Sequence, residues 1–167
     1  MSIDPTGRID RDADGRPRLV LTREFRAPIE DVWASVTESA RLERWIGSFT
    51  GDPASGRVVF RMNAEGGAPA EDVEITACEP PRLLAVTSRT SDGAWHLELA
   101  LSETDGVTKL VFRQPGIDPV EAESVGPGWE FYLDRLVAAE TGGDVGAIDF
   151  DRDYYPAMRD HYRASAG

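Results

Sequence analysis

The stretch that decides the fold is residues 128–139, GWEFYLDRLVAA. On a helical wheel at about 100° per residue, four of its large side chains fall within roughly a third of a turn. These side chains are Trp129, Tyr132, Leu133 and Leu136. The charged residues Glu130, Asp134 and Arg135 fall outside that arc. The pattern predicts an amphipathic helix whose apolar stripe lies against a core, a cavity or a partner chain.

Alternating apolar and polar residues before this helix predict a set of β-strands. The alternating segments are 18–25, 57–62, 71–79, 82–89, 94–101 and 107–113. The turn at 12–15 predicts a hairpin in which residues 8–10 pair with the first of these strands. Short connections favour an antiparallel meander. Each strand has one apolar face, so one face of the sheet must be covered, and the helices are the available cover.

Helices are expected on both sides of the strand run. The patterns at residues 27–36 and 39–46 predict two short helices after the first strand, with Pro28 in the first turn of one and Ser39 as a candidate N-cap of the other. Pro127 lies between two glycines, which predicts a break or kink before residues 128–139. Residues 141–150 are expected to form a connector, and residues 153–164 a short helix that begins near Pro156.

The order of elements resembles the helix-grip fold of the START-like (SRPBCC) superfamily, an α+β fold in which a curved antiparallel sheet wraps around a long C-terminal helix. Two blocks carry the resemblance: LTREFRAPIEDVWASVTESARLERWIG (21–47) and GWEFYLDRL (128–136). They match a subgroup related to the C-terminal domain of the activator of heat-shock protein 90 ATPase. The matching positions in the first block are Arg23, Phe25, Ala27, Pro28, Val32, Trp33 and Trp45.

The resemblance implies a domain at 18–140, with an N-terminal extension or hairpin arm at 1–17. It leaves a tail at 141–167, which we expect to pack on the domain or on a partner subunit. Phe131 points about 200° away from Trp129, toward the otherwise polar side of the predicted helix. The tail carries Phe150, Tyr154, Tyr155 and Met158, so it can cover Phe131, or a homodimer can form through the helix and the tail.

Composition narrows the classes of function. The chain has 167 residues and a net charge of −12, which disfavours binding to nucleic acid or to anionic lipid. No apolar run is long enough to span a membrane, and no apolar signal segment is visible, so a cytoplasmic protein is expected. Cys78 is the only cysteine, which excludes an internal disulfide and a thiolate metal cluster.

Motifs for metal or catalytic chemistry are incomplete. Asp10, Asp12, Asp14 and Gly15 match the first half of a calcium loop, but the twelfth position is Leu21 instead of Glu, which favours a plain acidic turn. A zinc site needs three or four ligands, and the sequence offers two separated histidines, His96 and His161. We therefore expect no metal, no cofactor and no catalytic residue.

A candidate binding cavity is predicted between the final helix and the sheet. Arg23 shares the inward face of its strand with Leu21 and Phe25, so it is either ion-paired, reaching for water, or a carboxylate-binding group in the cavity. The aromatic residues are either core packing or part of a ligand site. The predicted lining is Arg23, Trp45, Phe60, Met62, Trp95, Leu97, Phe112, Trp129, Tyr132, Leu133 and Leu136.

Three functions remain open on the sequence. A non-catalytic binder of a hydrophobic or amphipathic small molecule is favoured by the apolar inner face. A protein–protein interaction module, such as a co-chaperone or a stress-response protein, is the main alternative. An enzyme of the polyketide cyclase or dehydratase kind needs an acid, a base or a tyrosine in the cavity, and the predicted inner faces offer almost none.

Overall fold

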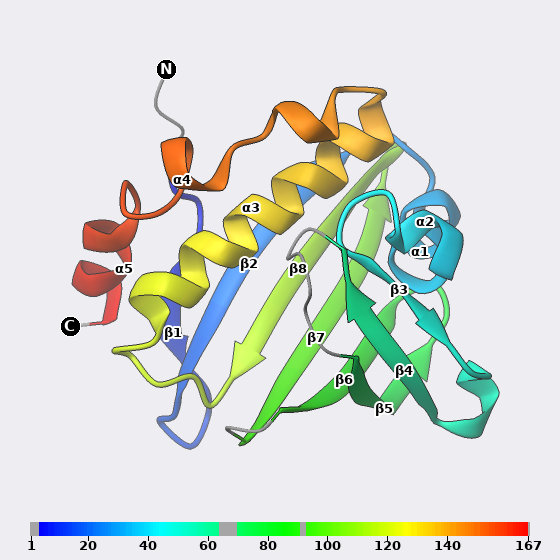
Figure 1. The fold of residues 1–167 in the computed structure, drawn as a ribbon, viewed down its shortest axis with the longest axis horizontal. Coiled ribbons are helices and arrows are strands. Elements are labelled where there is room, and N and C mark those ends of the chain that lie inside the picture. The colour runs from blue at the N-terminus through cyan, green and yellow to red at the C-terminus, as the bar shows by residue number, and fades with distance from the viewer. Residues whose placement is uncertain (1–3, 64–69, 91–92, 167) are drawn as a thin grey trace.

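The computed structural model describes residues 4–63, 70–90 and 93–166, and in this part of the chain eight strands form one antiparallel sheet. The strand order is β1-β2-β8-β7-β6-β5-β4-β3 (Figure 1). The strands are β1 (Arg8–Arg11), β2 (Pro17–Phe25), β3 (Gly47–Thr50), β4 (Arg57–Met62), β5 (Glu71–Glu79), β6 (Leu83–Thr90), β7 (Gly93–Thr104) and β8 (Val107–Pro115). The helices are α1 (Ile29–Thr37), α2 (Ser39–Leu42), α3 (Ala122–Thr141), α4 (Phe150–Asp153) and α5 (Arg159–Ala166), with short 3₁₀ turns η1 (Pro53–Ser55) and η2 (Val145–Ala147). The predicted α+β helix-grip fold is confirmed.

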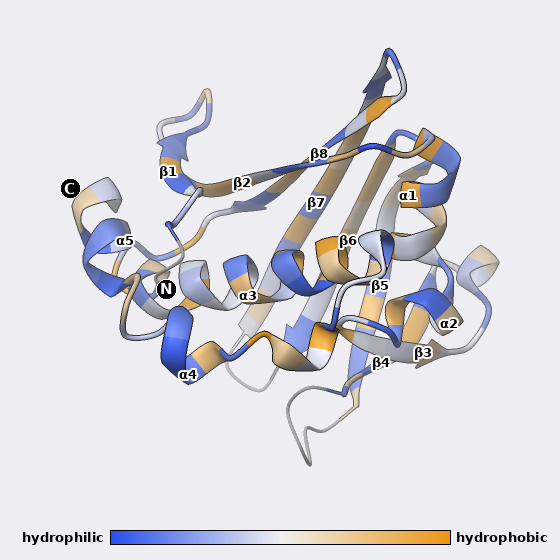
Figure 2. Ribbon diagram, turned by 90° about the horizontal axis from the view of Figure 1, so that it is seen from above, coloured by the Kyte–Doolittle hydropathy of each residue, from blue (hydrophilic) through white to orange (hydrophobic). Residues whose placement is uncertain are grey.

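The sheet curves around α3 instead of lying flat beneath it (Figure 2). The backbone of α3 packs closely on β2, near one edge of the sheet. Strands β3 and β4 form the opposite edge, and α1 and α2 connect β2 to that edge. As a result, one half of the inner face is directly under α3, while the other half faces it from a distance.

The region between α1 and β4 differs from the expectation. The second helix ends at Leu42, and residues Gly47–Thr50 form an edge strand that the sequence pattern did not indicate. Ser39 is not the N-cap, because it is the first residue of α2 and Glu38 occupies the N-cap position. Its hydroxyl instead donates to the carbonyl of Phe49 (3.0 Å) and accepts from the N–H of Phe49 (2.9 Å). Ser39 thus joins α2 to β3.

Of the break or kink expected at Pro127, the break is wrong, because α3 is one helix of 20 residues with Pro127 inside it (Figure 1). Pro127 lies in the second turn, where the missing N–H removes a single hydrogen bond from the helix start. The flanking Gly126 has a packing role: a Cβ at this position would lie 2.6 Å from the ring of Tyr162. Gly126 therefore reflects the close approach of α5 to α3.

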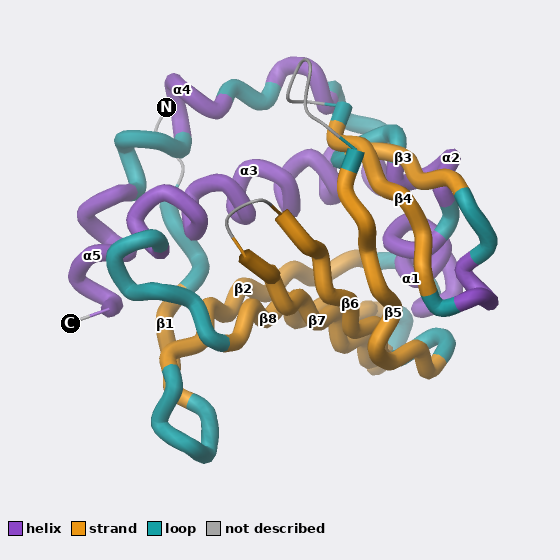
Figure 3. The backbone as a smooth tube through the Cα atoms, turned by 60° about the horizontal axis from the view of Figure 1, so that its bottom comes forward, coloured by secondary structure: helices purple, strands orange, loops and turns teal. Residues whose placement is uncertain are grey.

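The C-terminal tail crosses the side of α3 that faces away from the sheet (Figure 3). It forms α4 and α5, whereas the sequence predicted one helix over residues 153–164. Phe131 packs edge-on against Phe150 and Tyr154, with ring centroids 5.5 Å and 5.6 Å apart. Residues of the same chain therefore cover the apolar side chain on the outer side of α3.

The described residues contain no helix that is both long enough and apolar enough to cross a membrane.

Candidate functional site

A cavity of about 730 Å³ lies between α3 and the inner face of the sheet. The part of its wall that the strands form is almost entirely apolar and comes from β3 to β8. The strand residues in this wall are Phe49, Val58, Phe60, Met62, Val73, Ile75, Cys78, Leu84, Val86, Trp95, Leu97, Leu99 and Phe112, together with Glu71 and Ser88. Cavities of this size and character are typical of small-molecule binding sites.

The two halves of the inner face differ in how completely they are buried. Leu19, Leu21 and Leu110, on β2 and β8, have no exposed surface. Val73 and Val86, on β5 and β6, remain partly exposed although they point inward. The exposed surface of the second group is the cavity wall.

A β-bulge in β5 places Cys78 in this wall. The pairing of β5 with β6 shifts between Ile75 and Ala77, so Cys78 is opposite Leu84, which faces inward. The sequence pattern grouped Ala77 with Val73 and Ile75, and the bulge reverses that alternation.

The side chains opposite the strands are held in place by their own contacts. The indole of Trp129 lies 4.5 Å from the Phe112 ring and donates to the side-chain oxygen of Gln114 (3.0 Å). The indole of Trp45 donates to the carbonyl of Ser35 (2.9 Å). Because both N–H groups have partners inside the protein, these rings form an apolar wall whose orientation is fixed before a ligand arrives.

Most of the residues predicted for the lining are at the cavity wall, and two are not. Those at the wall are Trp45, Phe60, Met62, Trp95, Leu97, Phe112, Trp129, Tyr132 and Leu133. Leu136 is fully buried in the core, and Arg23 is not part of the wall.

Arg23 belongs to a buried polar network behind the cavity. Its guanidinium donates to Glu130 and Asp134 of α3, each at 3.0 Å, and to the hydroxyl of Thr6 at 2.7 Å. The prediction of a carboxylate-binding group in the cavity is therefore wrong. The alternative reading, an internal ion pair, is the one that the structure contains. The pair fixes α3 to β2.

Glu130 was expected on the polar, outward side of the helix, yet it is 1% exposed. It accepts from the N–H of Thr6 (2.6 Å) and from the hydroxyl of Tyr162 (2.8 Å), in addition to Arg23. Burial favours a raised pKa for Glu130, but the hydrogen bonds from Thr6, Tyr162 and Arg23 outweigh it, so the pKa lies below its ordinary value. The N-terminus and the tail thus close a second buried layer on the outer side of α3.

Glu71 is a polar lining residue that the sequence analysis missed. The hydroxyl of Ser88, which is 7% exposed, donates to its carboxylate at 2.7 Å. The alternation that places Val73 and Ile75 inward, continued back by two residues, identifies Glu71 as inward-facing. The signal was therefore present in the pattern, at the first residue of β5.

The other polar motifs do not contribute to the cavity. The carboxylate of Asp12 accepts from the N–H groups of Asp14 and Arg16 (2.9 Å each), so the acidic run is a hairpin turn stabilised by its own side chain. His96 contacts Thr87, and His161 contacts the carbonyl of Gly7. Among the described residues, no group of His, Cys, Asp and Glu is arranged to hold a metal ion.

Comparison with known proteins assigns the chain to a family. Residues 26–140, which run from the end of β2 through nearly all of α3, match the family model described as Activator of Hsp90 ATPase homolog 1-like protein. The chain belongs to this family. None of the curated proteins matches the chain. The match stops where the tail begins, so the segment that covers the outer side of α3 is not part of the family model.

Solved structures of low sequence identity share the fold of this family member. CalU16 from Micromonospora echinospora is 22% identical, over 98% of this chain and 92% of that chain, with a TM-score of 0.66. EF2215 from Enterococcus faecalis, a conserved protein of unknown function, is 21% identical, over 93% and 87%, with a TM-score of 0.69. MLL2253 from Mesorhizobium loti is 23% identical, over 76% and 98%, with a TM-score of 0.65. These likenesses show the fold.

Proposed function

We propose that this protein binds an apolar or amphipathic small molecule, without covalent chemistry, in the cavity between α3 and strands β3 to β8. The observation that carries the proposal is the partly exposed apolar wall around a space of about 730 Å³. Apolar surface left in contact with water costs about 25 cal/mol per Å² relative to buried surface. A ligand that covers this wall recovers that free energy, which provides the driving force for binding.

The fixed walls favour this function over simple incomplete packing. Trp129 and Trp45 are each held by an internal hydrogen bond, so they do not need to rearrange to admit a ligand. A preformed site avoids the entropy cost of ordering its side chains on binding.

Surface features lend less support to a protein-interaction module. Among the described residues, the exposed large apolar side chains are Val59, Trp95 and Val120, which belong to β4, β7 and the segment before α3. An interaction surface normally requires a contiguous apolar patch. Trp95 is at the cavity wall, which leaves two separated residues for such a patch.

The proposal is tested with a neutral environment-sensitive dye, N-phenyl-1-naphthylamine, and two matched substitutions. Val86→Phe adds a ring that projects into the cavity, whereas Val59→Phe adds the same ring to the outward face of β4. We expect saturable fluorescence enhancement with the native protein and with Val59→Phe, and an affinity weaker by about tenfold with Val86→Phe.

Circular dichroism and thermal unfolding of each variant serve as the folding control. The proposal fails if the native protein does not enhance the dye, or if Val86→Phe binds the dye as tightly as Val59→Phe does.

A further inference from the structure

We infer that the ligand is a cationic amphiphile, an apolar molecule that carries a protonated amine, and that Glu71 binds the amine. The inference rests on the proposed function and deepens it by assigning the polar group of the ligand. Glu71 contributes a carboxylate to a wall of otherwise apolar strand residues, apart from Ser88. A carboxylate in such surroundings forms a strong charge-assisted hydrogen bond with an ammonium group.

The contacts of Glu71 leave it available to a ligand. Among the described residues, its hydrogen-bond partner is the Ser88 hydroxyl, which donates to Oε2 at 2.7 Å. A single donor satisfies a small part of the accepting capacity of a carboxylate. Ser88 therefore orients the group, and the remaining lone pairs can accept from an amine.

The neighbours of Glu71 on the same face suit a cation with an apolar body. Phe60 is directly opposite Glu71 on β4. Ser88 is opposite Val73 on one side and opposite Trp95 on the other. Trp95 is 37% exposed and lines the cavity, so its ring face is available for a cation–π contact. The acidic group and the aromatic ring are thus separated on the sheet by Ser88.

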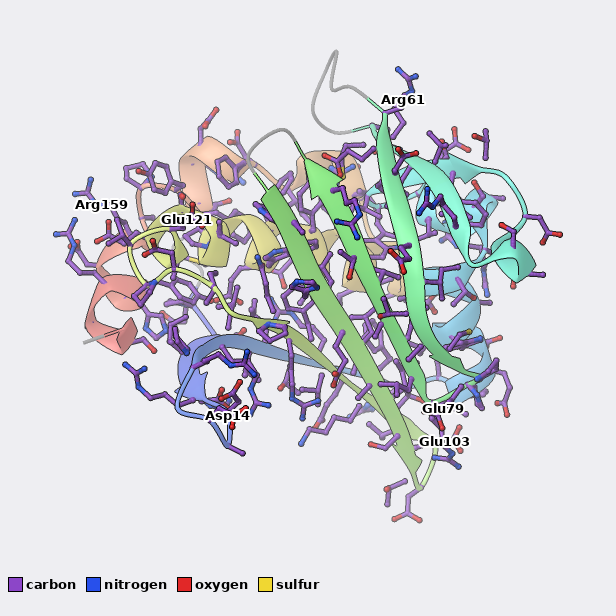
Figure 4. The ribbon with its side chains drawn as sticks, turned by 90° about the horizontal axis from the view of Figure 1, so that it is seen from below. Asp14, Arg61, Glu79, Glu103, Glu121 and Arg159 are labelled. Atoms are coloured by element: carbon purple, nitrogen blue, oxygen red, sulfur yellow. The ribbon has the colours of Figure 1, made fainter. Side chains whose placement is uncertain are left out.

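The described residues that line the cavity carry no positive charge that would repel an ammonium group. The charged residues of the lining among the described part of the chain are Glu71 and Asp151, and both are acidic. Arg61, next to Phe60 on β4, points away from the body of the molecule (Figure 4). Arg89 pairs with Glu74 at 3.5 Å. Residues 1–3, 64–69, 91–92 and 167, which lie outside the description, contain no Lys or Arg in the sequence.

Two further arginines near the cavity are already engaged. Arg23 is paired with Glu130 and Asp134. Arg135 donates to the carbonyls of Trp45 (2.9 Å) and Val145 (3.4 Å), and its guanidinium lies over the ring of Phe131. A ligand carboxylate would therefore enter an apolar space without a counter-charge, which carries a large desolvation cost.

The electrostatic field of the whole molecule also favours a cationic ligand. The net charge of −12 attracts cations and repels anions. This long-range effect is not specific to the cavity, so a test must separate it from the local effect of Glu71.

The experiment compares decylamine, decanol and decanoate, which share one apolar chain and differ in the polar group. Each displaces the neutral dye from the native protein, from Glu71→Gln and from Asp72→Asn. Asp72 is the residue after Glu71 and is exposed on the outward face of β5, so its substitution removes one negative charge without altering the wall. Ethanolamine, an amine without the chain, controls for charge alone.

For the native protein and for Asp72→Asn, we expect decylamine to displace the dye at a concentration about tenfold or more below that of decanoate, with decanol in between. For Glu71→Gln, we expect the amine and the alcohol to agree within about twofold. Ethanolamine should displace no dye.

Three outcomes overturn the inference while leaving the proposed function intact: decanoate displacing the dye as well as decylamine, an equal loss of amine preference in Asp72→Asn and Glu71→Gln, or an amine preference retained in Glu71→Gln. If the native protein binds no dye at all, the proposed function itself fails.

Discussion

The two halves of the inner sheet face are built from the same kinds of residue, but one half is packed core and the other half borders the cavity. In the closed half, on β2 and β8, Leu21 and Leu110 are fully buried beneath α3. In the open half, on β5 and β6, Val73 and Val86 face a cavity and remain partly exposed. One helix covers one stripe of a sheet, and here the sheet curves around α3, so that its other half faces the helix from a distance. Apolar alternation along a strand therefore identifies its inward face but does not distinguish a packed core from the wall of a binding cavity.

The position of α3 keeps the two halves different. Arg23 on β2 holds Glu130 and Asp134 of α3, and the Tyr154 hydroxyl of the tail donates to Asp134 at 2.6 Å. The helix is thus tied to one edge of the sheet and covered from outside by the tail. We expect this attachment to prevent α3 from settling onto the open half and closing the cavity.

The largest loss of stability is expected from removing the ion pair between Arg23 and Glu130, which lies behind the closed half. Glu130→Met leaves Asp134 as the one carboxylate paired with the buried Arg23 among the described residues, and it removes the acceptor of Thr6 and Tyr162. We therefore expect a loss of about 3–5 kcal/mol in the free energy of unfolding, measured with urea. The double variant Arg23→Met/Glu130→Met removes both charges and should be less destabilised than Glu130→Met. A double variant as unstable as the sum of the two single variants would contradict this role.

The next prediction compares the stability that one leucine contributes in each half of the sheet. Leu110→Ala opens a void in a fully packed core, and we expect it to cost about 3 kcal/mol. Leu97→Ala removes a side chain that already borders the cavity, and we expect about 1 kcal/mol. Thermal and urea unfolding measure both. Equal losses would mean that the wall around Leu97 is as tightly packed as the core.

The last prediction concerns how the attachment of the tail to α3 contributes to stability. Gly126→Ala places a Cβ against the Tyr162 ring and should destabilise the protein by about 1–3 kcal/mol. Gly128→Ala meets no atom within 4 Å and should be neutral or stabilising by up to about 1 kcal/mol, because Ala favours the helix. A destabilising Gly128→Ala, or a neutral Gly126→Ala, would show that α5 does not pack on α3 as described.

The sequence predicted the fold well because its signals are local. The stripe of Trp129, Tyr132 and Leu133, and the alternation of the strands, depend on neighbouring residues alone. The edge strand at Gly47–Thr50 was missed because its four residues carry no alternation of their own and its hydrogen bonds come from Ser39 and β4.

The candidate site was harder to predict because it depends on contacts between distant segments. Arg23 was placed inward correctly, but its partners lie more than 100 residues away, so its role in an ion pair was one of several readings. Glu130 lies on the polar side of the helical wheel, which predicts a surface residue, but Thr6 and Tyr162 donate to its carboxylate and help to bury it. Glu71 followed the strand alternation, but only the curvature of the sheet shows that this inward face borders open space.

The most direct test of the binding cavity is a titration of the protein with the neutral dye N-phenyl-1-naphthylamine, followed by methyl NMR of its Val, Leu and Ile side chains. We predict saturable shifts that are confined to the open half, at Val73, Ile75, Val86 and Leu97. Leu19, Leu21 and Leu110, in the closed half, should not move. Shifts spread equally over both halves, or no saturable shift at the wall, would contradict the account.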